Sequence, residues 1–229
     1  MFTFPTNHNS VNLIELHEKK INSISFNLFS VLWYLSIPKE QEFVLPIFTP
    51  SDLRSNLVHP SLIGKKEHIV PNFSFIDQNG NIVSEKTVEN KIYIVDFFFT
   101  SCPSICIDLT NNIKEVQSVF EENDDVLILS HSVDPKVDNI ERLQKYASIN
   151  NINNEKWFLL TGPIEETIRM AQLGYFAIAS IANHDENSLI HTENVVLIDR
   201  NRQIRGIYNG TSSLEISYLI DDIKKLLSY

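Results

Sequence analysis

The feature that most constrains the fold is an apolar run of strand length, Ile92–Phe99, which is followed at once by a segment containing both cysteines of the chain. Near-continuous apolar strands are typical of a sheet covered on both faces, so this run predicts a central strand. Apolar residues then recur at helical spacing at Leu109, Ile113, Val116 and Phe120. The sequence therefore places Cys102 and Cys106 at the junction between a buried strand and a helix.

The rest of the chain alternates short apolar runs with helical patterns. The segment 73–83 predicts a hairpin, because Asn and Gly in its turn tolerate the positive φ of tight turns. Further strands are predicted at 126–129, 157–160, 195–198 and 204–208, and further helices at 138–146, 164–171 and 214–226. This order of elements predicts an α/β fold with a layered sheet.

Charge and cysteine content exclude several classes of protein. The chain has 19 Lys and Arg against 29 Asp and Glu, a formal net charge of −10. Such a surface repels phosphate backbones, so we expect no nucleic-acid partner. Two cysteines are also too few for a scaffold held together by disulfides, which favours a chemical role for the pair.

The N-terminal part divides from the compact domain by composition. We predict an N-terminal segment at 1–40, an extended tether at 41–66 that contains Pro46, Pro50 and Pro60, and a folded domain at 67–229. The stretch 21–38 carries no charge, yet Asn and Ser residues interrupt it. A membrane anchor and a buried or surface-docked helix both remain open for this stretch, and a cleaved signal peptide fits it less well.

The position of the cysteines suggests their chemistry. The N-terminus of a helix carries partial positive charge, so we expect a thiol there to have a lowered pKa and to bind metals or attack disulfides. Pro103 suits the first turn of the helix, and residues four apart share one helix face. Two inert buried cysteines are the alternative. Asp96 lies within the apolar run, either as a buried carboxylate of raised pKa that relays protons to a thiol or at a point where one face is wet.

A metal site needs more than two sulfur ligands, so the histidines matter. His131 and His191 each lie at the edge of a strand expected to flank the cysteine strand, where ligands gather in α/β sheets. The sequence pattern alone does not choose between them.

Several segments together resemble the Sco/SenC family of copper-binding proteins. The segment Val95–Cys106 carries the resemblance, together with Ser132–Pro135, Trp157–Gly162, and Ile190–Thr192 ahead of Val195–Asp199. These landmarks occur in the family's order, and the resemblance covers residues 67–229. The chain departs from the family at Ile107, where a second Pro normally follows the second cysteine.

The resemblance implies a thioredoxin-like fold, with a central mixed sheet flanked by helices, and a copper site. Cys102, Cys106 and His191 would be the ligands of Cu(I) or Cu(II), which leaves His131 as a structural residue. Asp134 matches an acidic position near the family's site. Two thiolates and one imidazole suit copper, although zinc could occupy the same three ligands.

The implied function is that of a metallochaperone that assists assembly of the copper centre of a respiratory terminal oxidase. The expected partner is an oxidase subunit or another copper protein, and the expected location is the extracytoplasmic face of a membrane in the cell envelope. The alternative is a thiol-disulfide oxidoreductase that uses Cys102 and Cys106 as a redox-active pair to keep partner cysteines reduced.

Overall fold

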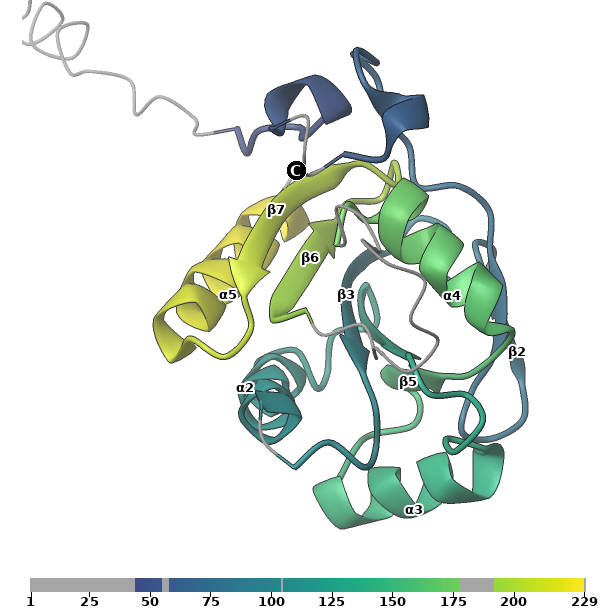
Figure 1. Cartoon of the computed structure of the whole chain (residues 1–229). Coiled ribbons are helices and arrows are strands. Elements are labelled where there is room, and N and C mark those ends of the chain that lie inside the picture. Colours follow the sequence, from purple (N-terminus) through teal and green to yellow (C-terminus); the bar gives the residue numbers. More distant parts are fainter. Residues whose placement is uncertain (1–43, 55–57, 104, 178–191, 229) are drawn as a thin grey trace, which may run out of the picture. The chain divides into compact units, whose positions relative to one another are not determined.

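The computed structural model of the chain describes residues 44–54, 58–103, 105–177 and 192–228 (Figure 1). All the elements below belong to the unit Leu45–Tyr229. Its strands are β1 (Ser74–Ile76), β2 (Ile82–Ser84), β3 (Ile92–Phe98), β4 (Val126–Ser132), β5 (Trp157–Leu160), β6 (Asn194–Ile198) and β7 (Ile204–Asn209). Its α-helices are α2 (Ile105–Val119), α3 (Ile140–Asn150), α4 (Ile164–Arg169) and α5 (Ser213–Leu227).

The main sheet has five strands in the order β5-β4-β3-β6-β7. Strand β3 runs parallel to β4, which runs parallel to β5, whereas β6 is antiparallel to both β3 and β7. All seven residues of β3 and all seven of β4 are buried, which confirms the prediction of a central strand. Because β3 and β4 are parallel, with Phe98 opposite Ser132, the loops that follow them leave the sheet at the same edge.

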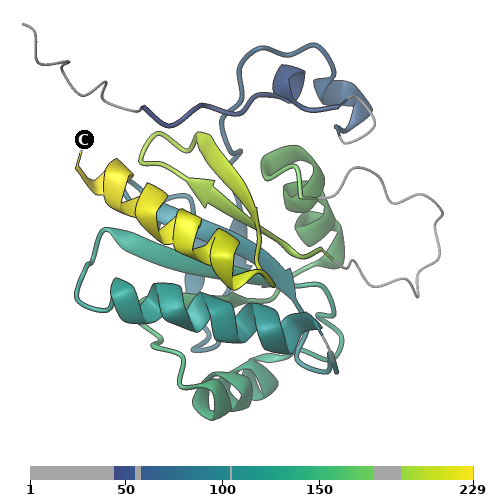
Figure 2. The same ribbon diagram turned by 90° about the vertical axis from the view of Figure 1, so that its left-hand side faces the viewer.

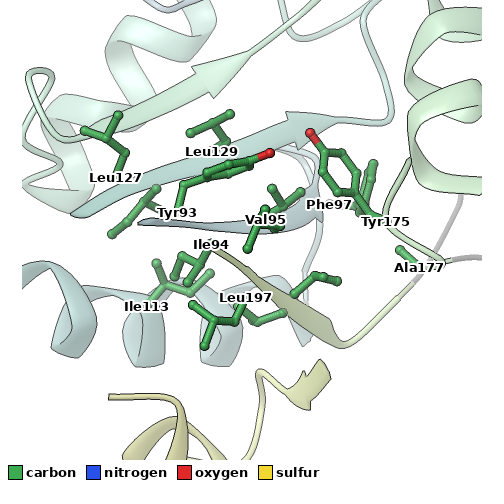
Figure 3. Close-up of a cluster of buried hydrophobic side chains, with 14 of the residues drawn as sticks. Tyr93, Ile94, Val95, Phe97, Ile113, Leu127, Leu129, Tyr175, Ala177 and Leu197 are labelled. Atoms are coloured by element: carbon green, nitrogen blue, oxygen red, sulfur yellow. The ribbon is translucent and has the colours of Figure 1, made fainter. Parts of the chain in front are cut away.

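Helices cover both faces of this sheet. Helices α2 and α5 lie side by side over one face, and α4 lies over the other (Figure 1; Figure 2). The side chains of β3 alternate between these layers, so that Ile94 lies near Ile113 of α2 and Phe97 lies near Tyr175, just after the π-helical turn η4 (Met170–Gly174) that follows α4 (Figure 3). The predicted α/β layering is therefore observed.

The hairpin is confirmed: β1 pairs antiparallel with β2, and Gly80 in the turn has φ +81°. The start of α3 differs from the sequence-based boundary at Asp138. The helix begins at Ile140, because the side chain of Asn139 caps it by accepting the N–H of Arg142 at 2.9 Å. Asp138 instead points into the protein, where its side chain is fully buried.

The chain before β1 packs on the edge of the sheet. Leu45, Val58 and Leu62 are buried, and the N–H of Phe48 donates to the carbonyl of Ile204 in the edge strand β7 at 2.8 Å. Short 3-10 turns at Pro50–Asp52 and Pro60–Leu62 interrupt this segment. The boundaries assigned from sequence at residues 40 and 66 stay predictions.

Within the described residues, none of the helices combines the length and the apolar character needed to cross a membrane. The stretch 21–38, the candidate for a membrane anchor or a docked helix, lies outside the described residues.

Candidate metal centre

The two cysteines lie where the chain leaves β3 and enters α2. Cys106 is the second residue of α2 and is buried, while Cys102 precedes the helix and packs, partly buried, against the core. A turn begins directly after β3, in which the N–H of Cys102 donates to the carbonyl of Phe99 at 3.2 Å. The predicted strand-to-helix junction is confirmed, but Pro103 lies before the helix rather than in its first turn.

The electrostatics of Cys106 differ from the sequence-based expectation. Burial raises the pKa of the Cys106 thiol, a hydrogen bond with the Cys102 side chain raises it further, and a hydrogen bond with the backbone of Phe99 lowers it. The predicted lowering of the Cys106 pKa is therefore wrong in the absence of a bound cation, because loss of hydration disfavours the thiolate. The hydrogen bond between the side chains also means that the two sulfur atoms are neighbours.

Asp96 lies on β3 and is 2% exposed, so the prediction of a buried carboxylate is confirmed over that of a wet strand face. Burial raises its pKa to about 7. The hydroxyl of Ser130 donates to the Asp96 carboxylate, and Nε1 of Trp157 donates to that hydroxyl at 2.8 Å. The charge of Asp96 contributes to the raised pKa of Cys106, which links the carboxylate electrostatically to the cysteine pair.

A second loop, which follows β4, approaches the turn at residues 99–102, called the cysteine turn below. Asp134 is half-buried in this loop, and its N–H donates to the hydroxyl of Ser132 at 3.1 Å. The N–H of Val133 donates to the carbonyl of Phe98 at 2.9 Å, so the Asp134 loop is joined to the end of the cysteine strand.

Sequence reasoning missed Asp138, which is the most connected carboxylate of this region. It is fully buried and accepts hydrogen bonds from Thr100 and Ser132, at the ends of β3 and β4. The sequence carried no signal for this role, because an acidic residue just before a helix is usually read as a cap.

His131 occupies the interior of the fold. Its ring centroid lies 4.6 Å from that of Phe75 and 5.4 Å from that of Phe97, and it also contacts Tyr175. Burial lowers its pKa to about 3, and neither ring nitrogen has a hydrogen-bond partner among the described residues. His131 is therefore a neutral ring enclosed by aromatic side chains.

His191 lies outside the described residues, which resume at Thr192. Within the described ranges, no three His, Cys, Asp or Glu side chains are grouped closely enough to hold a metal ion. The structure thus brings Cys102 and Cys106 together, with Asp96 and Asp134 on the strand and loop beside them.

Comparisons with known proteins identify the family and the fold. The SCO1/SenC family model matches residues 63–228. The SCO1 protein homolog of Bacillus subtilis is 30% identical over 134 residues, which are 58% of this chain and 69% of that protein. A SCO1/SenC family lipoprotein from Bacillus anthracis has a similar structure, with a TM-score of 0.63 and 28% identity over 72% of this chain and 98% of that one.

Two further solved structures are similar. BsSco, described as having a disulfide switch and as a member of the Sco family of cytochrome c oxidase assembly proteins, gives a TM-score of 0.60 at 26% identity, covering 71% of this chain and 95% of BsSco. ScoI of Arabidopsis thaliana, solved with copper bound, gives 0.55 at 26% identity, covering 71% of this chain and all of that one (100%). The match to these structures confirms the predicted thioredoxin-like fold.

Proposed function

The chain belongs to the SCO1/SenC family, and from this premise we propose that it is a metallochaperone whose cargo is a copper ion held by Cys102, Cys106 and His191. The observation that carries the proposal is the pair of neighbouring thiols at the carboxyl end of β3, where the Cys102 and Cys106 side chains hydrogen-bond each other. The copper-bound Arabidopsis relative supports the choice of metal.

The donor set fits copper by its chemistry. Two thiolates are soft ligands, which favour Cu(I), and an imidazole accommodates both Cu(I) and Cu(II). A bound cation would also offset the cost of ionising the buried Cys106 thiol, because it supplies the positive charge that the site otherwise lacks. Three protein ligands leave one side open for transfer to a partner, whereas a structural zinc site usually has four.

The family resemblance implies His191 as the third ligand, and the enclosure of His131 supports this proposal. A ring packed among Phe75, Phe97 and Tyr175 could reach a metal only if the aromatic cluster opened. Asp134 and Asp96 are proposed to support the site without binding the ion. The backbone N–H of Asp134 ties its loop to Ser132, and Asp96 places a buried carboxylate whose charge acts on Cys106.

Two relatives suggest a partner and a location. BsSco belongs to a family of cytochrome c oxidase assembly proteins, so the proposed recipient is a respiratory oxidase subunit or another copper protein. The Bacillus anthracis relative is a lipoprotein, which supports a site of action at the extracytoplasmic face of a membrane. The net charge of −10 favours docking onto a basic patch of the recipient.

A second candidate function rests on the same two thiols. Neighbouring cysteines can exchange with a partner disulfide, and BsSco is described as having a disulfide switch. In this alternative the protein keeps the cysteines of its partner reduced and carries no metal.

Anaerobic titration of the reduced protein with Cu(I), in competition with a Cu(I) chelator, distinguishes the metallochaperone from the oxidoreductase. We expect one ion per chain, loss of binding in Cys106→Ser, and strongly weakened binding in His191→Ala, because each variant removes a proposed ligand. His184→Ala is the matched control, because it removes an imidazole from the same stretch of sequence. Absence of binding, together with rapid reduction of a partner disulfide, would favour the oxidoreductase instead.

A further inference from the structure

The carboxylate of Asp138 connects the two loops that start at the carboxyl ends of β3 and β4. Its Oδ2 accepts the backbone N–H of Thr100 at 3.1 Å and the hydroxyl of Ser132 at 2.7 Å. Its Oδ1 accepts the hydroxyl of Thr100 at 2.5 Å. Asp138 is fully buried, so these donors take the place of water around the carboxylate.

A second set of contacts fixes the direction of these hydrogen bonds. Nε of Arg142 donates to Oγ1 of Thr100 at 2.6 Å and lies 3.8 Å from Oδ1 of Asp138. The Ser132 hydroxyl likewise accepts the N–H of Asp134 at 3.1 Å. Each hydroxyl therefore accepts one hydrogen bond and donates its own proton to Asp138, so a carboxylate fits this place and a donor group does not.

These contacts end at the cysteine turn. Thr100 is the second residue of the turn that closes with the hydrogen bond from the N–H of Cys102 to the carbonyl of Phe99. The backbone of Phe99 also hydrogen-bonds the Cys106 side chain. A group that holds Thr100 by both its backbone and its hydroxyl therefore holds the segment that sets the position of Cys102 relative to Cys106.

Building on the proposed function, we propose that Asp138 is the positioning residue of the cysteine pair: through Thr100 it fixes the 99–102 turn so that both sulfurs face one ion. Asp138 touches neither sulfur. It acts by joining the cysteine turn to the Asp134 loop, and its loss leaves the two thiols less well aligned while the sheet remains intact.

The first test compares Asp138→Asn with Glu141→Gln. The asparagine has the shape of aspartate, but its NH2 group must face one of the donors of Thr100 or Ser132. Glu141→Gln removes one negative charge from the exposed first turn of the same helix. We expect Cu(I) affinity to fall roughly tenfold in Asp138→Asn and to stay unchanged in Glu141→Gln, with both variants keeping the circular dichroism of the original chain.

The second test needs no metal. Reduced protein is equilibrated with oxidised dithiothreitol: the Cys102–Cys106 disulfide forms, and the two thiol protons and two electrons pass to the reagent, whose own disulfide opens to a dithiol. When the Cys102 and Cys106 thiols are aligned, the effective concentration of one thiol at the other is higher, which favours their disulfide. We therefore expect the equilibrium constant for the protein disulfide to fall several-fold in Asp138→Asn and to stay unchanged in Glu141→Gln.

The two measurements have separate meanings. If the original chain binds no Cu(I), the proposed function fails, while the dithiothreitol equilibrium still tests the positioning role. A folded Asp138→Asn protein with the original disulfide equilibrium overturns that role. If Asp138→Asn does not fold, Thr100→Val and Thr100→Ser are compared instead. The positioning role requires that the valine variant shifts the disulfide equilibrium and that the serine variant, which keeps the hydroxyl, has the original equilibrium. Any other pattern overturns the role.

Discussion

Asp96 shows how one side chain can be tuned by its immediate neighbours. Burial raises its pKa to about 7, and the hydrogen bond from Ser130 opposes that shift because it stabilises the charged form. We predict that Ser130→Ala raises the pKa of Asp96 by roughly one further unit, since one hydrogen bond to a charged group is worth about 1.5 kcal/mol or more.

This change can be followed by infrared titration of the protonated carboxyl band, which Asp96→Asn identifies by its disappearance. An unchanged or lowered midpoint in Ser130→Ala would show that the hydroxyl does not stabilise the carboxylate.

Single residues differed in how well the sequence predicted them. Asp96, Cys102 and Cys106 could be found because they interrupt or directly follow an apolar run. Asp138 could not, because its partners Thr100 and Ser132 come from the ends of two other strands, and only the pairing of β3 with β4 brings them together.

The edge strand β7 depends on the segment that precedes the hairpin. Arg205 of β7 donates to the carbonyls of Leu45 and Pro46 and forms an ion pair with Asp199 at 2.8 Å. The side chains of the pair are only 9% and 7% exposed. The chain thus covers an edge that would otherwise offer unpaired backbone groups.

We predict that Arg205→Met lowers the free energy of unfolding by about 3 kcal/mol, because breaking a buried ion pair leaves a buried charge without its partner. The variant should also speed hydrogen exchange at the N–H of Phe48. Lys224→Gln is the control: its ion pair with Asp221 is 56% and 64% exposed, so we expect a loss below about 1 kcal/mol. Equal losses in urea unfolding would contradict the prediction.

For the molecule as a whole, the sequence predicted the succession of helices and strands but not the order of strands in the sheet. Apolar runs and turn residues are local signals, whereas the placement of β6 between β3 and β7 depends on contacts between distant segments. The cap at Asn139 also illustrates this limit, because the inward orientation of Asp138 follows from tertiary hydrogen bonds. The copper ligand set came from family resemblance, since spacing left His131 and His191 equivalent.

Two buried groups make opposite contributions to the pH dependence of stability. Burial lowers the pKa of His131 from 6.5 to about 3 and raises that of Asp96 from 3.8 to about 7. Between pH 3.8 and 6.5, folding therefore releases one proton from His131 and takes up one at Asp96. His131 makes the free energy of unfolding fall as the pH falls, and Asp96 makes it fall as the pH rises. The two dependences on pH therefore cancel in this window.

Replacing one of the two groups should leave the pH dependence of the free energy of unfolding that the other group causes. Relative to the original chain, we predict that the free energy of unfolding of His131→Phe falls with rising pH by about 1.4 kcal/mol per unit inside the window, while that of Asp96→Asn rises by a similar amount. Phenylalanine suits the aromatic surroundings of His131 and has no unpartnered nitrogens, so the first variant should fold. Urea unfolding at several pH values measures both slopes, and the double variant should restore the original dependence. Single variants that keep the original slope would mean that these two groups do not titrate in the folded protein as their burial implies.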